Sequence, residues 1–291
     1  MLNKEAKAIW LASYPKSGNT WVRLFYTALT GEEDININNI KTDGIISNRN
    51  VIDEGLGIYS SQIPQHDLLP YRTKLYGKWI NTHKERETVF CKVHDACTLE
   101  GNVLFTPAIT RGVVYVMRNP FDMAASLANH NGSTIDKALR LICSDQHHLA
   151  GRKTKLNTQI SQYLGTWSYH VESWTNVHRN NILILKYEDL LHDSLNEFSK
   201  LANYLEFTYS AGEIESAIEK TSISVLQEQE KTVKFREKPH GDNFFRSGKT
   251  GGWRNELTTD QVNLIIDCNY STLLKYGYID ADGNVLVSRD I

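Results

Sequence analysis

The sequence lacks the cysteine patterns and the long apolar runs that assign many chains to a class at once. Its four cysteines form no Cys-x-x-Cys pair and have no histidine partners at zinc-finger spacing, so we expect reduced thiols, mostly in the core. No window approaches the ~18 apolar residues that span a bilayer, and no basic segment followed by an apolar one opens the chain. We therefore expect an unprocessed, soluble, cytoplasmic protein without a membrane partner.

An excess of charge of either sign is also missing. Lys and Arg number 32 against 34 Asp and Glu, for a formal net charge of −2. This balance gives no general reason to expect nucleic acid as a partner, so any anion site must be built from local motifs. With 291 residues, 41% of them hydrophobic, and no internal repeat, the chain predicts a single domain over residues 1–291.

Short β-branched runs alternate with segments of helical spacing. The predicted strands are 8–13, 89–93, 113–117 and 182–187, and the predicted helices are 120–131, 194–206 and 258–276. This alternation predicts an α/β fold with a central parallel sheet flanked by helices. The polar stretches 31–88 and 229–252 show no clear periodicity and are expected to be long functional loops.

The segment SYPKSGNTW, residues 13–21, follows the first predicted strand and opens a helix. A helix N-terminus attracts anions because its first N–H groups are unpaired. Gly18 permits close approach, Ser17 and Thr20 supply hydroxyls, and Lys16 supplies charge. An ordinary strand-to-helix turn with a solvated lysine is the alternative. In a Walker A loop the lysine follows the second glycine, whereas Lys16 precedes Gly18, which disfavours magnesium-dependent nucleotide chemistry and predicts no bound metal.

A second candidate anion site follows the strand at 113–117. Ligands bind at the carboxyl edge of an open parallel sheet, and this edge carries Arg118, with Ser126 nearly two helical turns later. A guanidinium and a hydroxyl suit a phosphomonoester. A salt bridge from Arg118 to Asp122 is an equally open reading of the same residues.

SYPKSGNTW together with YVMRNPFDMAAS, residues 115–126, resembles the cytosolic-type sulfotransferases, which use 3′-phosphoadenosine 5′-phosphosulfate (PAPS) and release 3′-phosphoadenosine 5′-phosphate (PAP). The resemblance implies a P-loop-like three-layer sandwich with a phosphosulfate-binding loop after the first strand. It places the 3′-phosphate on Arg118 and Ser126. It assigns the phosphosulfate loop to Lys16, Ser17, Gly18, Asn19, Thr20 and Trp21.

Further segments resemble the family in the same order along the chain. FFRSGKTGGWR, residues 244–254, is similar to the segment that closes over the 3′-phosphate, although Ser247 replaces a basic residue and Gly252 an aspartate. The nucleotide contacts that this similarity implies are Phe245, Arg246, Ser247 and Gly248, with Tyr187 in KYED at the adenine and Thr221 and Ser222 beside the nucleotide.

Lys92-Val93-His94 resembles the family's Lys-Thr-His, which implies that His94 is the general base and that Lys92 steadies the transferring group. The pKa of histidine also suits a base near neutral pH. Lys16 is expected to meet the leaving oxygen and Ser126 to restrain Lys16. Thr82-His83 has similar letters, but His94 is preferred because it ends a predicted strand. The His147-His148 pair is expected at the surface or in a loop rather than on a metal.

We therefore predict metal-independent transfer of a sulfuryl group from PAPS to a hydroxyl, or less readily an amine, of a small molecule. A secondary metabolite such as an alkaloid is the expected acceptor, in the manner of bacterial natural-product sulfotransferases, and Glu54 or Asp95 could meet a cationic one. A kinase-like phosphotransferase and a non-catalytic nucleotide-binding module are the alternatives. The dimerisation motif matches only in part at Arg254, Thr258, Thr259 and Asn263, so monomer and dimer both stay open.

Overall fold

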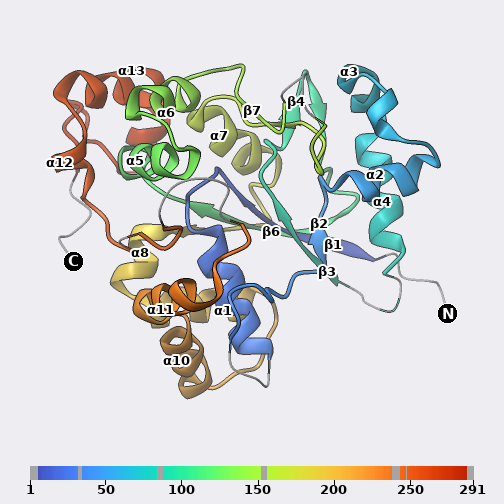
Figure 1. The fold of residues 1–291 in the computed structure, drawn as a ribbon, viewed down its shortest axis with the longest axis horizontal. Helices are drawn as coiled ribbons and strands as arrows, with labels where there is room; N and C mark the ends of the chain where they lie inside the picture. The colour runs from blue at the N-terminus through green and yellow to red at the C-terminus, as the bar shows by residue number, and fades with distance from the viewer. Residues whose placement is uncertain are drawn as a thin grey trace. The chain divides into compact units, whose positions relative to one another are not determined.

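The computed structural model describes residues 6–31, 35–83, 85, 88–151, 156–237, 243–246 and 248–286 (Figure 1). Its strands are β1 Lys7–Ser13, β2 Gly44–Ile45, β3 Thr88–Val93, β4 Thr98–Leu99, β5 Asn102–Val103, β6 Thr110–Met117, β7 His148–Leu149, β8 Gln162–Tyr163 and β9 Ile182–Lys186. Its α-helices are α1 Asn19–Thr30, α2 Arg49–Leu56, α3 Gln65–Leu68, α4 Arg72–Asn81, α5 Pro120–Asn131, α6 Ile135–Ile142, α7 Trp167–Val177, α8 Tyr187–His192, α9 Ser194–Tyr204, α10 Ala211–Lys220, α11 Ile223–Val233, α12 Trp253–Glu256 and α13 Thr259–Lys275. Two 3₁₀ turns cover Ser60–Gln62 and Leu69–Tyr71.

The main sheet has five strands in the order β2-β3-β1-β6-β9. β1 pairs with β3 in parallel from Lys7 opposite Thr88 to Ala12 opposite Val93, and six of the seven residues of β1 are buried. A strand buried on both faces reads as a continuous apolar run, which is why the sequence revealed it. The predicted α/β class, a central parallel sheet flanked by helices, is confirmed.

The order in which the chain adds strands to the sheet reverses at β1. β3 lies on one side of β1 and β6 on the other, so β1 is a topological switch point, where ligands of open α/β sheets bind at the carboxyl edge. The segment that follows β1 is the anion loop predicted from the sequence. The fold thus presents this loop at the edge where a ligand is expected.

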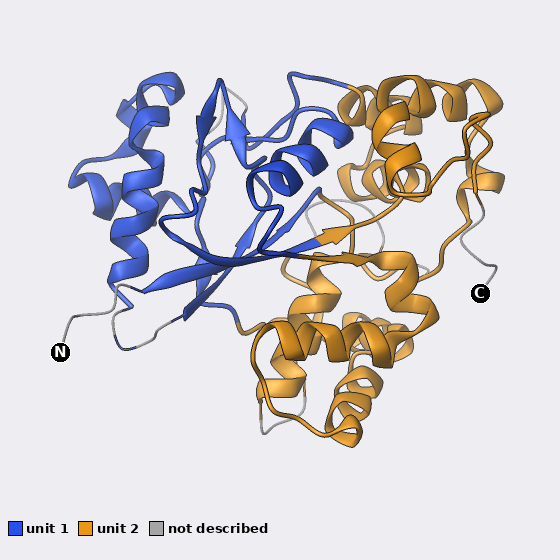
Figure 2. Cartoon of the chain, turned by 180° about the vertical axis from the view of Figure 1, so that it is seen from behind, with its two compact units in different colours: residues 1–14, 42–115, 144–182 blue, residues 15–41, 116–143, 183–291 orange. Residues whose placement is uncertain are grey.

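The chain divides into two compact units, each assembled from three stretches (Figure 2). Unit 1 contains 1–14, 42–115 and 144–182, and unit 2 contains the remaining stretches. The expectation of a single domain over residues 1–291 stays a prediction. Within the ranges that the structure describes, no helix has both the length and the apolar character needed to cross a bilayer.

Each unit has an aromatic core of its own. In unit 1, Phe105 stacks on Trp174 and Tyr76 and meets the edge of Trp10, and all four are buried. In unit 2, Phe25 of α1 stacks on Phe198 of α9, with ring centroids 3.9 Å apart. Aromatic burial of this kind is a leading stabilising term, and in unit 2 it packs α1 against α9.

The expectation of long loops over 31–88 is wrong, because α2 and α4 lie there. Asn48 caps α2 by accepting from the N–H of Asn50, and α4 buries Leu75, Tyr76 and Ile80 on one face. A glycine interrupts the apolar pattern of each helix, Gly55 in α2 and Gly77 in α4, and interior glycines hide helical periodicity. The stretch 229–252 is likewise not all loop, because α11 extends to Val233.

Candidate functional site

The loop between β1 and α1 has the backbone geometry of an anion site. α1 begins after Gly18, whose φ of 104° is left-handed and whose position offers no side-chain cap. Lys16 also has a positive φ, 71°, a conformation that L-residues hold at a cost and that recurs at ligand sites. The N–H of Trp21 donates to the carbonyl of Gly18 at 3.0 Å, and because the N-cap supplies no side-chain acceptor, the positive end of the α1 dipole is suited to an anion.

Gly18 lies against the ring of Tyr187, the first residue of α8. A Cβ at position 18 would stand 2.6 Å from Cδ2 of Tyr187, so only glycine fits there. The Tyr187 ring is buried, and burial raises the pKa of its hydroxyl. The ring of Tyr187 thus packs against the loop at Gly18, a role that the sequence did not reveal.

We expect Gly18→Ala to lower the free energy of unfolding by about 3 kcal/mol, because it combines a left-handed residue with a clash against a buried ring. Gly277→Ala is the matched control, since Gly277 has a φ of 70° and no atom within 4 Å of its would-be Cβ. It should cost about 1 kcal/mol. Urea unfolding of both variants measures the difference, and equal losses would mean that the contact with Tyr187 is unimportant.

Arg118, at the end of β6, connects three segments of unit 2. Its side chain donates to the carbonyl of Lys16 at 3.3 Å and to that of Lys249 at 3.2 Å. Its guanidinium lies 4.4 Å from the ring centroid of Tyr187. The residue is 9% exposed, and its buried Nε has no acceptor in the described part of the chain. An unsatisfied buried donor is costly, so this nitrogen points to a bound anion.

Asp122 does not serve as the salt-bridge partner that the sequence left open for Arg118. Its carboxylate accepts from the hydroxyl of Thr250 at 3.0 Å and from the N–H groups of Gly251 and Trp253 at 2.8 and 3.0 Å. The segment 250–253 is therefore anchored to the first turn of α5. Sequence reasoning missed this anchoring role, because the partners lie more than a hundred residues apart.

The segment 244–248 is held by α11. Glu230 accepts from the N–H groups of Phe244 and Phe245, and Gln227 donates to the carbonyls of Phe245 and Arg246. Gly248, with a φ of 62°, would place a Cβ 2.7 Å from Ile223. The contacts of Phe245 and Gly248 with a nucleotide stay predictions, and Ser247 lies outside the described residues.

Two cationic side chains of the predicted site have protein partners in this structure. The ammonium of Lys16 stands 3.8 Å from the ring centroid of Phe244. Arg246 is exposed and forms a two-pronged salt bridge with Glu256 at 3.0 and 3.1 Å. Exposed pairs of this kind contribute about 1 kcal/mol or less, so a phosphate can replace Glu256 at low cost.

The remaining predicted nucleotide residues of unit 2 occupy helix ends or helix interiors. The hydroxyl of Thr221, the C-cap residue of α10, donates to the carbonyls of Ala217 and Ile218. Ser222 is the N-cap of α11, and Ser126 lies half-buried on α5. Of the loop residues, Ser17 and Asn19 are buried and Thr20 is half-buried. Their contacts with a nucleotide stay predictions.

Trp21 is half-buried in the first turn of α1, in edge contact with the rings of Tyr187 and Phe198. Its indole Nε1 is a second buried donor without an acceptor in the described residues. An aromatic side chain with an unused donor suits a heterocyclic base.

His94 follows β3 in unit 1. Its Nδ1 lies 2.9 Å from the carbonyl oxygen of Ser13 and 3.3 Å from the Ser13 hydroxyl. A carbonyl only accepts, so Nδ1 carries the proton and Nε2 of the neutral ring keeps its lone pair. The ring is thereby oriented as a base requires. Lys92 lies two residues earlier on β3, where side chains share one face.

A buried histidine network adjoins His94. Nε2 of His170 donates to the carbonyl of His94 at 3.0 Å, and the Tyr115 hydroxyl meets Nδ1 of His170 at 2.8 Å. His147 lies in the loop before β7, as expected, but it is buried and 2.7 Å from the Tyr14 hydroxyl, whereas His148 is exposed. Burial lowers the pKa of both His147 and His170 to about 4. Both rings are neutral at pH 7, and His170 holds the peptide of His94 in place.

A family model of the sulfotransferase domain matches residues 6–275, most of the chain. The chain belongs to the sulfotransferase family. Among curated relatives, sulfotransferase 2A6 of Rattus norvegicus is 27% identical over 161 residues, which cover 52% of this chain and 52% of the relative. This sulfotransferase therefore aligns with about half the length of that protein. Flavonol 4′-sulfotransferase of Flaveria chlorifolia is 26% identical over 276 residues, 89% of this chain and 78% of the relative.

A solved structure of retinol dehydratase in a complex with retinol and PAP superposes on this sulfotransferase with a TM-score of 0.60. The alignment covers 93% of this chain and 83% of the other at 19% identity, which shows a shared fold. No three His, Cys, Asp or Glu side chains gather as metal ligands do among the described residues. Independence from metal remains a prediction to be tested.

Proposed function

We propose that this sulfotransferase uses PAPS to transfer a sulfuryl group to a hydroxyl, or less readily an amine, of a small molecule. The observation that carries the proposal is Arg118, a buried guanidinium that contacts the loop after β1 and the segment around Lys249 and keeps one donor unused. The segments it joins are those that resemble PAPS-binding motifs. A guanidinium so placed suits the 3′-phosphate that distinguishes PAPS from ATP.

The proposed roles follow from the residues. PAPS supplies the sulfuryl group and leaves as PAP. Nε2 of His94 takes the proton of the acceptor hydroxyl while the hydroxyl oxygen forms a bond to sulfur. Lys16 neutralises the charge that grows on the phosphate oxygen of PAPS while the bond between this oxygen and sulfur breaks. Lys92 steadies the transferring group, and Ser126 restrains Lys16 until both substrates are bound. Alignment and charge stabilisation are the main demands of such group transfer, as in phosphoryl transfer.

A secondary metabolite such as an alkaloid is the proposed acceptor. Curated relatives include a flavonol sulfotransferase and a luciferin sulfotransferase, which supports small molecules as a class. The kinase-like alternative is disfavoured because the loop places its lysine before the glycine. The non-catalytic alternative is disfavoured because Ser13 orients His94 as a base.

Calorimetric titration with PAP, ADP and ATP, without added metal, tests the donor assignment. We expect PAP to bind at micromolar concentration or tighter, and ADP and ATP to bind at least about a hundredfold more weakly, since a charge-assisted bidentate contact is lost. Equal or preferential binding of ATP would overturn the assignment and favour a phosphotransferase. Tight PAP binding without turnover of any acceptor would favour the nucleotide-binding module.

A further inference from the structure

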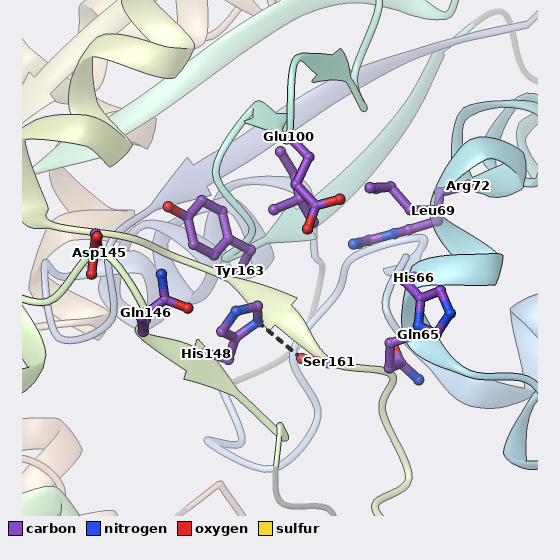
Figure 3. Close-up of a pocket in the computed structure, with 11 residues that line it drawn as sticks. Gln65, His66, Leu69, Arg72, Glu100, Asp145, Gln146, His148, Ser161 and Tyr163 are labelled. Atoms are coloured by element: carbon purple, nitrogen blue, oxygen red, sulfur yellow. Dashed lines mark hydrogen bonds between the residues drawn. The ribbon is translucent and has the colours of Figure 1, made fainter.

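Unit 1 contains a cavity of about 510 Å³ that none of the predicted site residues lines. α3 and α4 form one wall, the β4–β5 hairpin a second, and β7 with β8 a third (Figure 3). The polar residues used below are Arg72, Glu100, Asp145, His148, Ser161 and Tyr163. A cavity of this size can hold a small organic molecule, and nine of the eleven side chains that line it carry polar groups, Leu69 and Leu99 being the exceptions.

The side chains that line the cavity carry a net negative charge when the salt bridge between Arg72 and Asp95 is counted as neutral. Arg72 forms a buried salt bridge with Asp95 at 2.7 Å, with both side chains 4% exposed or less. Burial acts to lower the pKa of Arg72, but Asp95 more than offsets this and raises it, so the pair is ionised and neutral overall. Asp95 is thus unavailable to a cationic acceptor, contrary to the expectation from the sequence.

Two histidines belong to the lining. His66 is paired with Asp67 at 3.2 Å, and His148 adds no positive charge near neutral pH. Burial, with Arg72 close by, lowers the pKa of His148, and its Nδ1 meets the Ser161 hydroxyl at 3.1 Å. Two carboxylates remain, those of Glu100 and Asp145. Neither forms a salt bridge within the residues that the structure describes. The cavity therefore favours a cation.

Glu100 occupies a position that its backbone does not favour. It is the first residue of the two-residue turn between β4 and β5, with a φ of 49°, and Gly101 follows with a φ of 76°. Asn, Asp and Gly are the residues preferred at such a position. The turn directs the Glu100 carboxylate into the space that the Arg72 guanidinium enters from α4 (Figure 3).

The cavity walls are bonded to the residues directly after His94. Arg72 binds Asp95, and the N–H of Ala96 donates to the carbonyl of Tyr163 at 2.7 Å. Both walls thus connect to the chain within two residues of the proposed base. A molecule in the cavity lies in the unit that carries His94, where the acceptor has to be.

We propose that this cavity binds the acceptor and selects a hydroxylated organic cation, with its ammonium group on the Glu100 carboxylate and with Asp145 adding to the negative charge of the lining. This inference rests on the proposed function, because it names the substrate class of that reaction. Arg72 and Tyr163 remain as donors for uncharged polar groups of the same molecule. A carboxylate-bearing acceptor would face two like charges and is disfavoured.

Three phenols with one skeleton test the charge preference: tyramine, 4-ethylphenol and 3-(4-hydroxyphenyl)propionate. Their binding to the full chain saturated with PAP is measured by calorimetry, which does not require turnover. We expect tyramine to bind about tenfold more tightly than 4-ethylphenol, the propionate being weakest, since a hydrogen bond to a charged group has this strength. Glu100→Gln should weaken tyramine about tenfold and leave 4-ethylphenol within about twofold.

Asp145→Asn is the second variant and should have the same selective effect. Glu215→Gln is the matched control, because Glu215 is an exposed carboxylate of α10 outside the cavity lining, and it should change nothing. Equal binding of the three phenols, no measurable tyramine binding, or an equal loss for tyramine and 4-ethylphenol in Glu100→Gln would overturn the inference. Sulfuryl transfer without charge preference would still support the proposed function, and selective binding without transfer would support the inference alone.

Discussion

Replacing His94 with alanine is expected to lower kcat about a thousandfold while PAP affinity changes less than about twofold. The reason is the orientation of the ring: Ser13 accepts from Nδ1, and Nε2 is the proposed base. Without that nitrogen, the acceptor hydroxyl must lose its proton to water. Steady-state kinetics with any acceptor that is turned over, together with calorimetric PAP titration, measures both quantities.

His83→Ala is the matched control, because His83 stands in the similar tripeptide but follows α4 instead of a sheet strand. It should retain wild-type kcat. Far-ultraviolet circular dichroism verifies that both variants are folded. If His94→Ala keeps more than about a tenth of wild-type kcat, His94 is not the base, and a residue of the acceptor pocket must be considered.

Replacing Arg118 with alanine is expected to remove the preference for PAP over adenosine 5′-phosphate, which lacks the 3′-phosphate. We expect the affinity ratio of the two nucleotides to fall about a hundredfold, the value of a desolvated charge-assisted pair. The ratio is the decisive quantity because Arg118 also supports the carbonyls of Lys16 and Lys249. Loosening of those segments weakens both nucleotides alike and cancels in the ratio.

Arg118→Lys keeps the charge but not the paired donors, so it should recover only part of the ratio. Arg140→Ala on α6, an exposed position, serves as the control and should leave the ratio unchanged. An unaltered ratio in Arg118→Ala would place the 3′-phosphate elsewhere, with Arg246 as the next candidate.

The parallel strands and the three long helices were accessible to sequence reasoning because burial on both faces and regular capping leave local patterns. Thr258, for instance, caps α13 together with Gln261 in a reciprocal box, and the helix was expected to begin there. The helices between 31 and 88 were missed because their apolar faces are short and carry glycines. Packing against β1 stabilises α4, and that contact has no local signature.

The candidate site also has a part that the sequence could predict and a part that it could not. The loop residues and Arg118 stand next to strand ends, where chain order alone predicts a ligand. The contacts that build the site around them, such as Asp122 with Gly251 or Glu230 with Phe245, join residues far apart in sequence. In the sequence alone, Asp122 and Glu230 cannot be told from ordinary surface carboxylates. The buried partners of His94 were hidden for the same reason, since a lone histidine pattern predicts no tertiary neighbour.

The turn at Glu100 has a consequence for efforts to stabilise this protein. Design rules for tight hairpins recommend asparagine or glycine where Glu100 stands, and relief of a left-handed glutamate is worth about 1 kcal/mol. Laboratory selection for heat resistance alone should therefore discard this glutamate early. The selected variants would be more stable but less selective, and would accept neutral phenols as readily as amines. Thermal stability and substrate selectivity would then be in conflict at a single side chain.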